Sequence, residues 1–396
     1  MRVAMRTGNV SQTRPVLYNL EALRGFCALM VALVHVPWTT HLLFLPIVYN
    51  AWMFVDFFFV LSGFIIAFNY ADSGQKPFHL QGFMVRRFFR LYPLHIVTLI
   101  MLLAVEIFRE LVVPLLTQLP PRGAFQDPFG VTLVLNVLLL HATGLTTQNI
   151  LNTPSWSIST EFWTYLLFAF ICKLWIKPGK RVAAMAALGG CALMALLWLN
   201  GAGGIATPIQ YGWPRCIMSF SMGVVVWFFH ARWRPRPDDR WLDASYLVLF
   251  PSIYILMGFA GRTSLLNLAV VPLFGLIIYM FAIDGGSRVK KVMQTAPMQA
   301  LGRLSYSIYM VHVFWTSIFG FALNRFFAGK TTIFEMGNRL DVSLVLGDLV
   351  TIIYLLCVIG TAALTYQIIE QPWRRYGGRL AKRLNGEPTM TSPAVV

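Results

Sequence analysis

Apolar runs of about 20 residues recur along the whole chain and set the limits on what it can fold into. A run of that length forms a helix able to cross the hydrocarbon core of a bilayer, which is about 30 Å thick. The chain is 57% hydrophobic and only 12% charged, whereas a soluble globular protein is about 25% charged. The sequence therefore predicts an all-α polytopic membrane protein.

We expect about ten transmembrane helices and one further apolar segment that does not cross. The predicted spans are residues 18–37, 50–69, 91–112, 156–175, 182–200, 209–229, 243–260, 264–283, 303–324 and 343–367. The shorter stretch 129–143 is assigned to a re-entrant or outward-lying segment, because a full crossing would invert every later loop. Such segments are tolerated where they are buried in protein.

The distribution of positive charge predicts the orientation. Segments assigned to one face carry Lys and Arg in a roughly four-to-one excess over the other face, and the positive-inside rule places both termini in the cytoplasm. We therefore expect a cytoplasmic segment 1–17, a transmembrane domain 18–375 and a largely disordered cytoplasmic tail 376–396. The net charge of +16 then reflects this rule and contact with anionic lipid. No aromatic-basic nucleic-acid module is recognised.

The cysteines give no sign of a metal or redox site. The chain has five, all of them in apolar segments, without a CxxC pair and without a His/Cys spacing that suits zinc. We interpret them as small packing residues and expect no metal.

The stretch Leu20–His35 carries two ionisable residues in an otherwise apolar helix. At a rise of about 1.5 Å per residue, Arg24 and His35 lie roughly 16 Å apart along the axis, or about half of a bilayer core. Ionisable groups inside membrane helices are costly and usually mark function. The alternative is that Arg24 reaches the headgroups and His35 is a packed polar residue.

Two acidic residues are predicted at the depth of His35. Asp56 lies about six residues from the outer end of the second span, and Glu161 lies within about two turns of the start of the fourth. Either carboxylate could orient the imidazole and raise its basicity. Both residues also allow a non-catalytic interpretation. Asp56 could stay hydrated near the membrane interface, and Glu161 could form a structural hydrogen bond to a neighbouring helix.

Arginines and aromatic residues alternate before the third span, in FMVRRFFRLYP. One interpretation is a basic amphipathic helix on the inner leaflet. The other is a cluster in which Arg87 and Arg90 grip an anionic cofactor, since arginine forks suit phosphate. Arg303 and Tyr306 are predicted at the same face, and His312, deeper in that span, is interpreted as a hydrogen-bonded packing residue.

At the end of the last span, Glu370 is expected to pair with Arg374 or with the basic cluster, and Pro372 to end the helix.

Six pieces of the sequence together resemble the acyltransferase-3 family of integral membrane acyltransferases. In chain order they are LEALRGFCALMVALVH, VDFFFVLSGF, RRFFRLYP, PSWSISTEFWTY, LGRLSYSIYMVH and IIEQPWRR. The family's key arginine and histidine correspond to Arg24 and His35, and its RxxR element to Arg87 and Arg90. Its acidic positions correspond to Asp56 and Glu161.

This resemblance implies transfer of an acyl group, usually acetyl, from cytoplasmic acyl-CoA to a hydroxyl of an envelope or exported glycan or glycolipid. It implies a bacterial inner-membrane protein, and we expect a stand-alone member, without the SGNH domain that some members carry. Arg24, Arg87, Arg90, Arg303 and Tyr306 would hold the donor. His35 would act as general base, or would carry the acyl group covalently.

Two alternatives from other classes stay open at this point. Ten spans with buried ionisable residues would also suit a proton-coupled exporter or flippase of a lipid-linked glycan, although we find no internal repeat. A membrane sensor that binds acyl-CoA without catalysis is the second.

Overall fold

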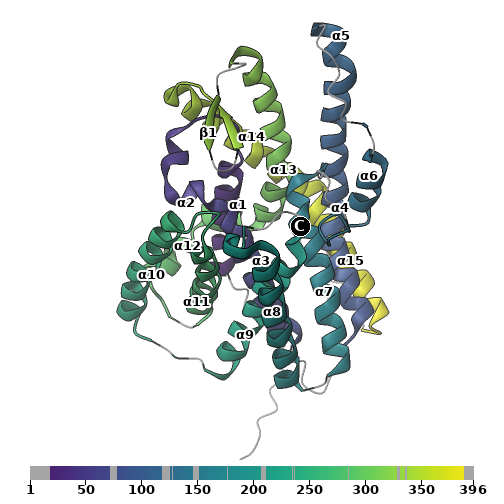
Figure 1. Ribbon diagram of the computed structural model, residues 1–396. Coiled ribbons are helices and arrows are strands. Elements are labelled where there is room, and N and C mark those ends of the chain that lie inside the picture. Colours follow the sequence, from purple (N-terminus) through teal and green to yellow (C-terminus); the bar gives the residue numbers. More distant parts are fainter. Residues whose placement is uncertain are drawn as a thin grey trace, which may run out of the picture.

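The computed structural model describes residues 18–387, except 72–77, 118–124, 127, 146–150, 176, 207–210, 234, 236, 284, 328–330 and 335–336. Most of these residues are helical (Figure 1). The helices are α1 (Tyr18–Val34), α2 (Pro46–Tyr49), α3 (Phe54–Tyr70), α4 (Leu80–Ile107), α5 (Val113–Thr117), α6 (Phe129–Val137), α7 (Trp156–Leu174), α8 (Pro178–Asn200), α9 (Gly212–Arg232), α10 (Asp239–Phe259), α11 (Val270–Ala282), α12 (Arg288–Met293), α13 (Ala296–Phe327), α14 (Leu344–Thr365) and α15 (Gln371–Leu384).

Each of the ten predicted spans contains a helix. Within the described ranges, 6 helical stretches are long and apolar enough to cross a membrane by length and composition. They are Ala51–Tyr70, Pro178–Asn200, Asp239–Phe259, Leu265–Ala282, Ala296–Phe327 and Leu344–Leu384. The chain is thus a helical membrane protein, and a total of ten spans stays a prediction.

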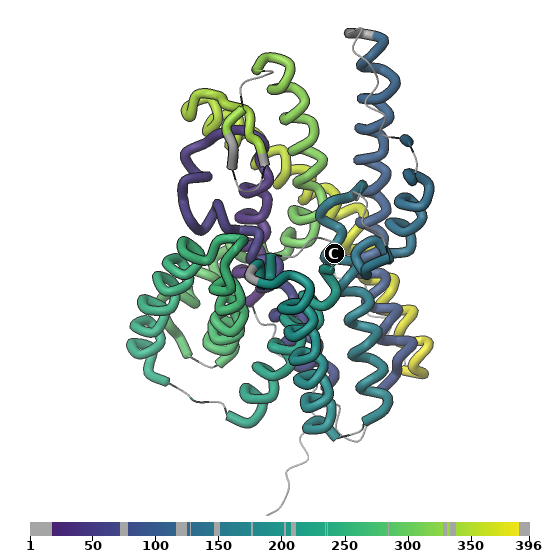
Figure 2. Tube along the Cα trace, in the orientation of Figure 1, coloured from purple at the N-terminus to yellow at the C-terminus, as the bar shows by residue number. Residues whose placement is uncertain are grey.

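The first helix packs along a helix from the far end of the chain. Figure 2 shows purple α1 beside green α13, and these two helices make an extensive contact. A methyl group at Gly302 would overlap the backbone of Glu21, so only glycine lets the two backbones approach this closely. The contact brings residues near the start of α1 next to the Ser305–Tyr309 region of α13.

Two facing glycines bring α3 and α9 together. A methyl group at Gly63 would overlap the carbonyl of Phe220, and one at Gly223 would overlap the carbonyl of Val60. Small residues at such crossings let helix backbones approach closely. This crossing sets the position of Asp56, on α3, relative to Arg215, on α9.

We expect Gly223→Ala to destabilise the protein by about 1–3 kcal/mol, because the added methyl forces the backbones of α3 and α9 apart. Gly190→Ala, on α8, is the matched control, since nothing lies within 4 Å of the added carbon there. Thermal unfolding of the detergent-purified variants measures both. Equal midpoints for the two would contradict the close crossing.

A short β-hairpin departs from the all-α prediction. Strands β1 (Thr331–Phe334) and β2 (Gly337–Leu340) pair antiparallel between α13 and α14. A bridge joins Trp38 to Leu340, and the guanidinium of Arg339 donates to the carbonyl of Val34 at 2.7 Å. Burial lowers the pKa of Arg339 to about 10. The hairpin thus closes over the end of α1, next to His35.

The segment predicted not to cross is a short helix followed by turns. Helix α6 has 9 residues, which at about 1.5 Å per residue is too short to span a bilayer. The carbonyl of Leu139, a residue with a φ of 55°, accepts hydrogen bonds from Ser159 at 2.6 Å and Trp163 at 2.8 Å. His95 Nε2 lies 2.9 Å from the carbonyl of Asn136, so the segment is held against α4 and α7.

The C-terminal part is more ordered than predicted. Helix α14 continues through a π-helical turn, Tyr366–Glu370, into α15, so Pro372 does not end the helix. It lies in the first turn of α15, directly after the π-helical turn. The predicted disordered tail is therefore wrong from 376 to Leu384, and residues 388–396 lie outside the described ranges. Trp373 stacks on Phe89 of α4, with ring centroids 5.7 Å apart.

Candidate active site

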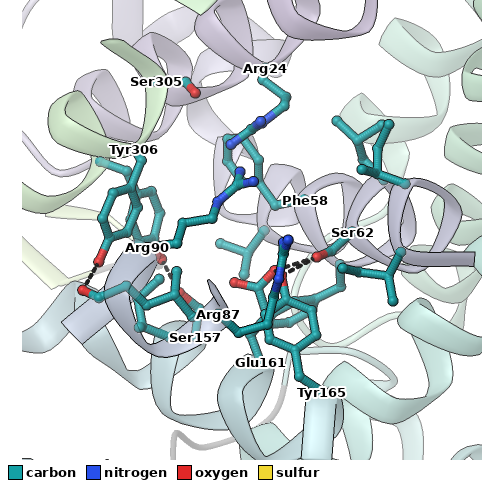
Figure 3. A pocket seen from close by; sticks show the side chains of 18 residues that line it. Arg24, Phe58, Ser62, Arg87, Arg90, Ser157, Glu161, Tyr165, Ser305 and Tyr306 are labelled. Atoms are coloured by element: carbon teal, nitrogen blue, oxygen red, sulfur yellow. Dashed lines mark hydrogen bonds between the residues drawn. The ribbon is translucent and has the colours of Figure 1, made fainter. Parts of the chain in front are cut away.

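Three arginines from two helices converge on one cavity, which we call the arginine cavity (Figure 3). It lies between α1, α3, α4, α7 and α13, and its polar lining residues are Arg24, Ser62, Arg87, Arg90, Ser157, Glu161, Tyr165, Ser305, Tyr306 and Tyr309. Its volume is about 80 Å³, far below the roughly 300–1,000 Å³ of a pocket that encloses a whole drug-sized ligand. It can take the end of a ligand and not a whole coenzyme.

Helix periodicity explains why Arg87 and Arg90 share this cavity. Residues three apart lie on the same face of α4. The guanidinium of Arg87 lies 5.7 Å from the ring centre of Phe83 and 5.8 Å from that of Tyr165. Its Nε is buried without a hydrogen-bond partner in the described part of the chain. Arg86 faces elsewhere and donates to the hydroxyl of Tyr70 at 3.1 Å.

Glu161 is the single carboxylate among the described residues that line the arginine cavity. It accepts hydrogen bonds from Ser62, on α3, and from Tyr165, one turn further on α7, both at 2.5 Å. The structural hydrogen bond that the sequence left open is therefore present. Of the ion pairs found between described residues, none includes Arg24, Arg87 or Arg90. Three arginines against one carboxylate leave an excess of positive charge suited to an anion.

The structure separates two residues that were predicted to act together on the donor. Tyr306 lines the arginine cavity and donates its hydroxyl hydrogen to the carbonyl of Leu91 at 2.6 Å. Arg303 is exposed and does not line the cavity. It precedes Ser305 by two positions, which is about 200° around a helix, so Arg303 points away from the cavity, and its part in binding the donor stays a prediction.

His35 lies one residue beyond the end of α1 and lines a second cavity, which we call the histidine pocket. This pocket has a volume of about 170 Å³ and is lined by His35, Trp52, Val55, Thr153, Pro154, Trp156, Ala206, Arg215, Arg262 and Tyr309. The Nδ1 of His35 lies 2.7 Å from the carbonyl of Val31. With the hydrogen on Nδ1, that carbonyl orients the ring and leaves Nε2 as a proton acceptor.

Asp56 does not orient His35, contrary to the prediction. It is fully buried and binds Arg215, whose Nε lies 3.2 and 3.1 Å from its two oxygens, and it also accepts from Ser219 at 2.9 Å. The Arg215 guanidinium lies between two indole rings, 5.5 Å from the ring centre of Trp52 and 5.3 Å from that of Trp156. The charge of the Asp56 carboxylate is thus neutralised by Arg215 in the protein interior.

Glu161 does not reach His35 either, because its hydrogen bonds hold it in the arginine cavity. Neither predicted carboxylate therefore forms a hydrogen bond with the imidazole among the described contacts. The predicted convergence of three acid–base groups resolves into three separate sites.

A second histidine lies against the first. The ring centroids of His35 and His312 are 5.0 Å apart. His312 is hydrogen-bonded, as predicted, with Nδ1 2.6 Å from the carbonyl of Tyr309. Its Nε2 is buried without a partner among the described residues. The sequence shows a histidine in the YMVH stretch of α13. Hydropathy alone does not say which helix lies against the face of α13 that carries this histidine.

Comparison with known proteins gives three matches along the chain. The family model Acyl_transf_3, described as an acyltransferase domain, matches residues 17–369. Acyltransferase MdmB of Streptomyces mycarofaciens is 27% identical over 343 residues, which cover 82% of this chain and 81% of that protein. Protein 2 in picA locus of Rhizobium radiobacter is 30% identical over 167 residues, covering 40% and 85%. No solved structure matches.

Proposed function

Since the chain belongs to the acyltransferase-3 family and is an acyltransferase, we propose that it is a transmembrane O-acyltransferase with acyl-CoA as its donor. The acceptor is a hydroxyl of an envelope or exported glycan or glycolipid, and acetyl is the acyl group we expect. The observation that carries the proposal is the contact between two unlike cavities. One is rich in arginine, the other contains His35, and both are lined by Tyr309.

The arginine cavity is the proposed donor site. Arg24, Arg87 and Arg90 would bind phosphate or other polar groups of acyl-CoA, since guanidinium groups form paired hydrogen bonds with phosphate. The cavity is too small for the nucleotide part, so this part stays at the mouth. The pantetheine arm is long enough to thread roughly half of a bilayer core, and carries the thioester toward His35.

The reaction at His35 is general-base catalysis. The Nε2 atom removes the proton of the acceptor hydroxyl, whose oxygen attacks the thioester carbon. The C–S bond breaks, and the proton on His35 passes to the leaving thiolate. The orienting group is the Val31 carbonyl instead of the predicted acid. An acyl-histidine intermediate is the alternative route, in which Nε2 itself attacks the thioester carbon.

From the predicted charge bias we infer that the arginine cavity faces the cytoplasm and the histidine pocket lies nearer the other side, and we propose a bacterial inner membrane as the location. Acyl-CoA and the acceptor would then meet without either of them crossing the membrane. A glycan flippase does not need a cytoplasmic cluster of arginines, and this favours the enzyme over the transporter.

Replacing Arg87 and Arg90 together by alanine is expected to raise KM for acyl-CoA by about 10²- to 10⁴-fold and to lower kcat less. Each charge-assisted hydrogen bond from an arginine to acyl-CoA contributes about 1.5–3 kcal/mol. Because these bonds hold acyl-CoA equally in the ground state and the transition state, their loss raises KM more than it lowers kcat. Steady-state kinetics with varied acyl-CoA measures the change. Arg86→Ala is the control, because this neighbouring arginine is bound to Tyr70. An unchanged KM in the double variant would place the donor site elsewhere.

The function itself is tested with purified protein in liposomes. Acetyl-CoA labelled on its acetyl group is supplied on one side and an envelope-polysaccharide extract on the other. We expect label on the extract. Intact acetyl-CoA after incubation would contradict the proposal and favour a transporter or sensor. Release of CoA without labelled product would support the donor site and show that the extract lacks the acceptor.

A further inference from the structure

The two cavities meet at a wall made of two residues. Val55 and Tyr309 each line both the arginine cavity and the histidine pocket. If the thioester enters through one cavity and the acceptor through the other, as in the proposed function, then the acyl carbon is transferred from the sulfur to the acceptor oxygen at this wall. Val55 is apolar, so Tyr309 supplies the polar group of the shared wall.

The hydroxyl of Tyr309 is held in a defined direction. It lies 2.8 Å from the Oγ of Ser157. The hydroxyl of Ser157 donates its own hydrogen to the carbonyl of Pro154 at 3.1 Å. The phenol therefore donates to Ser157. The ring of Phe58 packs edge-on against Tyr309, with centroids 5.8 Å apart, and Tyr309 is only 6% exposed.

The other two tyrosines of the arginine cavity have their hydroxyl groups engaged. Tyr306 donates to the carbonyl of Leu91, and Tyr165 donates to Glu161. Neither residue lines the histidine pocket. Of these three tyrosines, Tyr309 alone lines both cavities. Its O–H donates to the hydroxyl of Ser157, which is a weaker acceptor than the carbonyl and the carboxylate that bind the other two.

We propose that Tyr309 is a further catalytic residue, whose O–H donates to the carbonyl oxygen of the thioester. When the acceptor oxygen attacks, the carbonyl π electrons move onto this oxygen and give a tetrahedral oxyanion. The phenol, turned from Ser157 to this oxygen, stabilises the charge. As the C–S bond breaks, the carbonyl reforms and the thiolate leaves with the proton from His35. Ser157 positions the phenol and does not contact the oxyanion.

The first test is Tyr309→Phe, which keeps the ring and removes the donor. Loss of one oxyanion donor lowers kcat by about 10²- to 10³-fold. Affinity for S-propyl-CoA, a thioether without a carbonyl, is expected to stay at the wild-type value. Tyr246→Phe is the matched control, since that buried hydroxyl has no partner among the described residues, and both quantities should stay unchanged. A Tyr309→Phe variant with kcat within threefold of wild type would overturn the assignment.

The second test is Ser157→Ala, which separates catalysis from structure. If Tyr309 only fastened helices through Ser157, removing either hydroxyl would cost the same. We expect Ser157→Ala to retain kcat within tenfold, since the phenol is still present. A loss as large as that of Tyr309→Phe would overturn the inference. The inference rests on the proposed function, but their failures differ: an inactive wild type would refute the function, whereas an active wild type with equal variants would refute only the role of Tyr309.

Discussion

Replacement of His35 by alanine is expected to lower kcat for acyl transfer by about 10²- to 10⁴-fold, the usual contribution of a general base. The side chain ends in a half-buried ring at the edge of a pocket, and its hydrogen bond is to the carbonyl of Val31 in its own helix end. Its loss therefore breaks no hydrogen bond to another helix and removes the ring contact with His312. The protein should insert and unfold like wild type, and transfer of labelled acetyl in liposomes gives the rate.

The control is His41→Ala. His41 is an exposed histidine six positions further on, and its partner is Asp348 at 2.6 Å. Full activity is expected there. Wild-type activity in His35→Ala would show that the base is elsewhere. Rapid quenching of wild type with labelled acetyl-CoA separates the two chemical routes, because only an acyl-histidine intermediate puts label on the protein.

Much of the arginine cavity, the proposed donor site, could be predicted from the sequence because its key spacing is local. Arg87 and Arg90 are three residues apart, and helical geometry alone puts them on one face. The ten helices were likewise predictable, since a run of apolar residues fixes where a membrane helix lies along the chain.

The partners across helices could not be predicted in the same way. Hydropathy estimates the depth of a residue in the membrane, but neither the rotation of a helix about its axis nor the identity of its neighbours. Asp56 and His35 were expected at one depth, yet Asp56 turns to Arg215, 159 positions away. The same lack of rotational information hid the approach of His312 to His35 and the position of Arg303 outside the cavity lining.

The hairpin and α15 were missed for a different reason. The strands are 4 residues each, too short to show a clear alternation of polar and apolar positions. Helix α15 is strongly basic, and only its contact with α4, through Trp373 on Phe89, shows that it is packed. The amino-acid composition of such segments does not report their contacts.

The pairing of Asp56 with Arg215 leads to the second large effect. Asp56→Ala is expected to destabilise the protein by about 3–5 kcal/mol, because it leaves a buried guanidinium without its counter-charge. Arg215 is itself only 4% exposed and borders the histidine pocket, so bulk water does not replace the carboxylate. Chemical unfolding in detergent, followed by tryptophan fluorescence, measures the change. Asp348→Ala removes an exposed ion pair and should cause little change.

The double variant Asp56→Ala with Arg215→Ala decides between a structural and a catalytic role for the acid. If the pair is structural, removing both charges restores most of the lost stability, since no uncompensated charge remains. The restored protein should then also transfer acetyl far better than His35→Ala. A double variant that is stable yet as inactive as His35→Ala would return Asp56 to the catalytic machinery. In that case the contact with Arg215 would represent a resting arrangement, and the carboxylate would have to turn toward the imidazole during turnover.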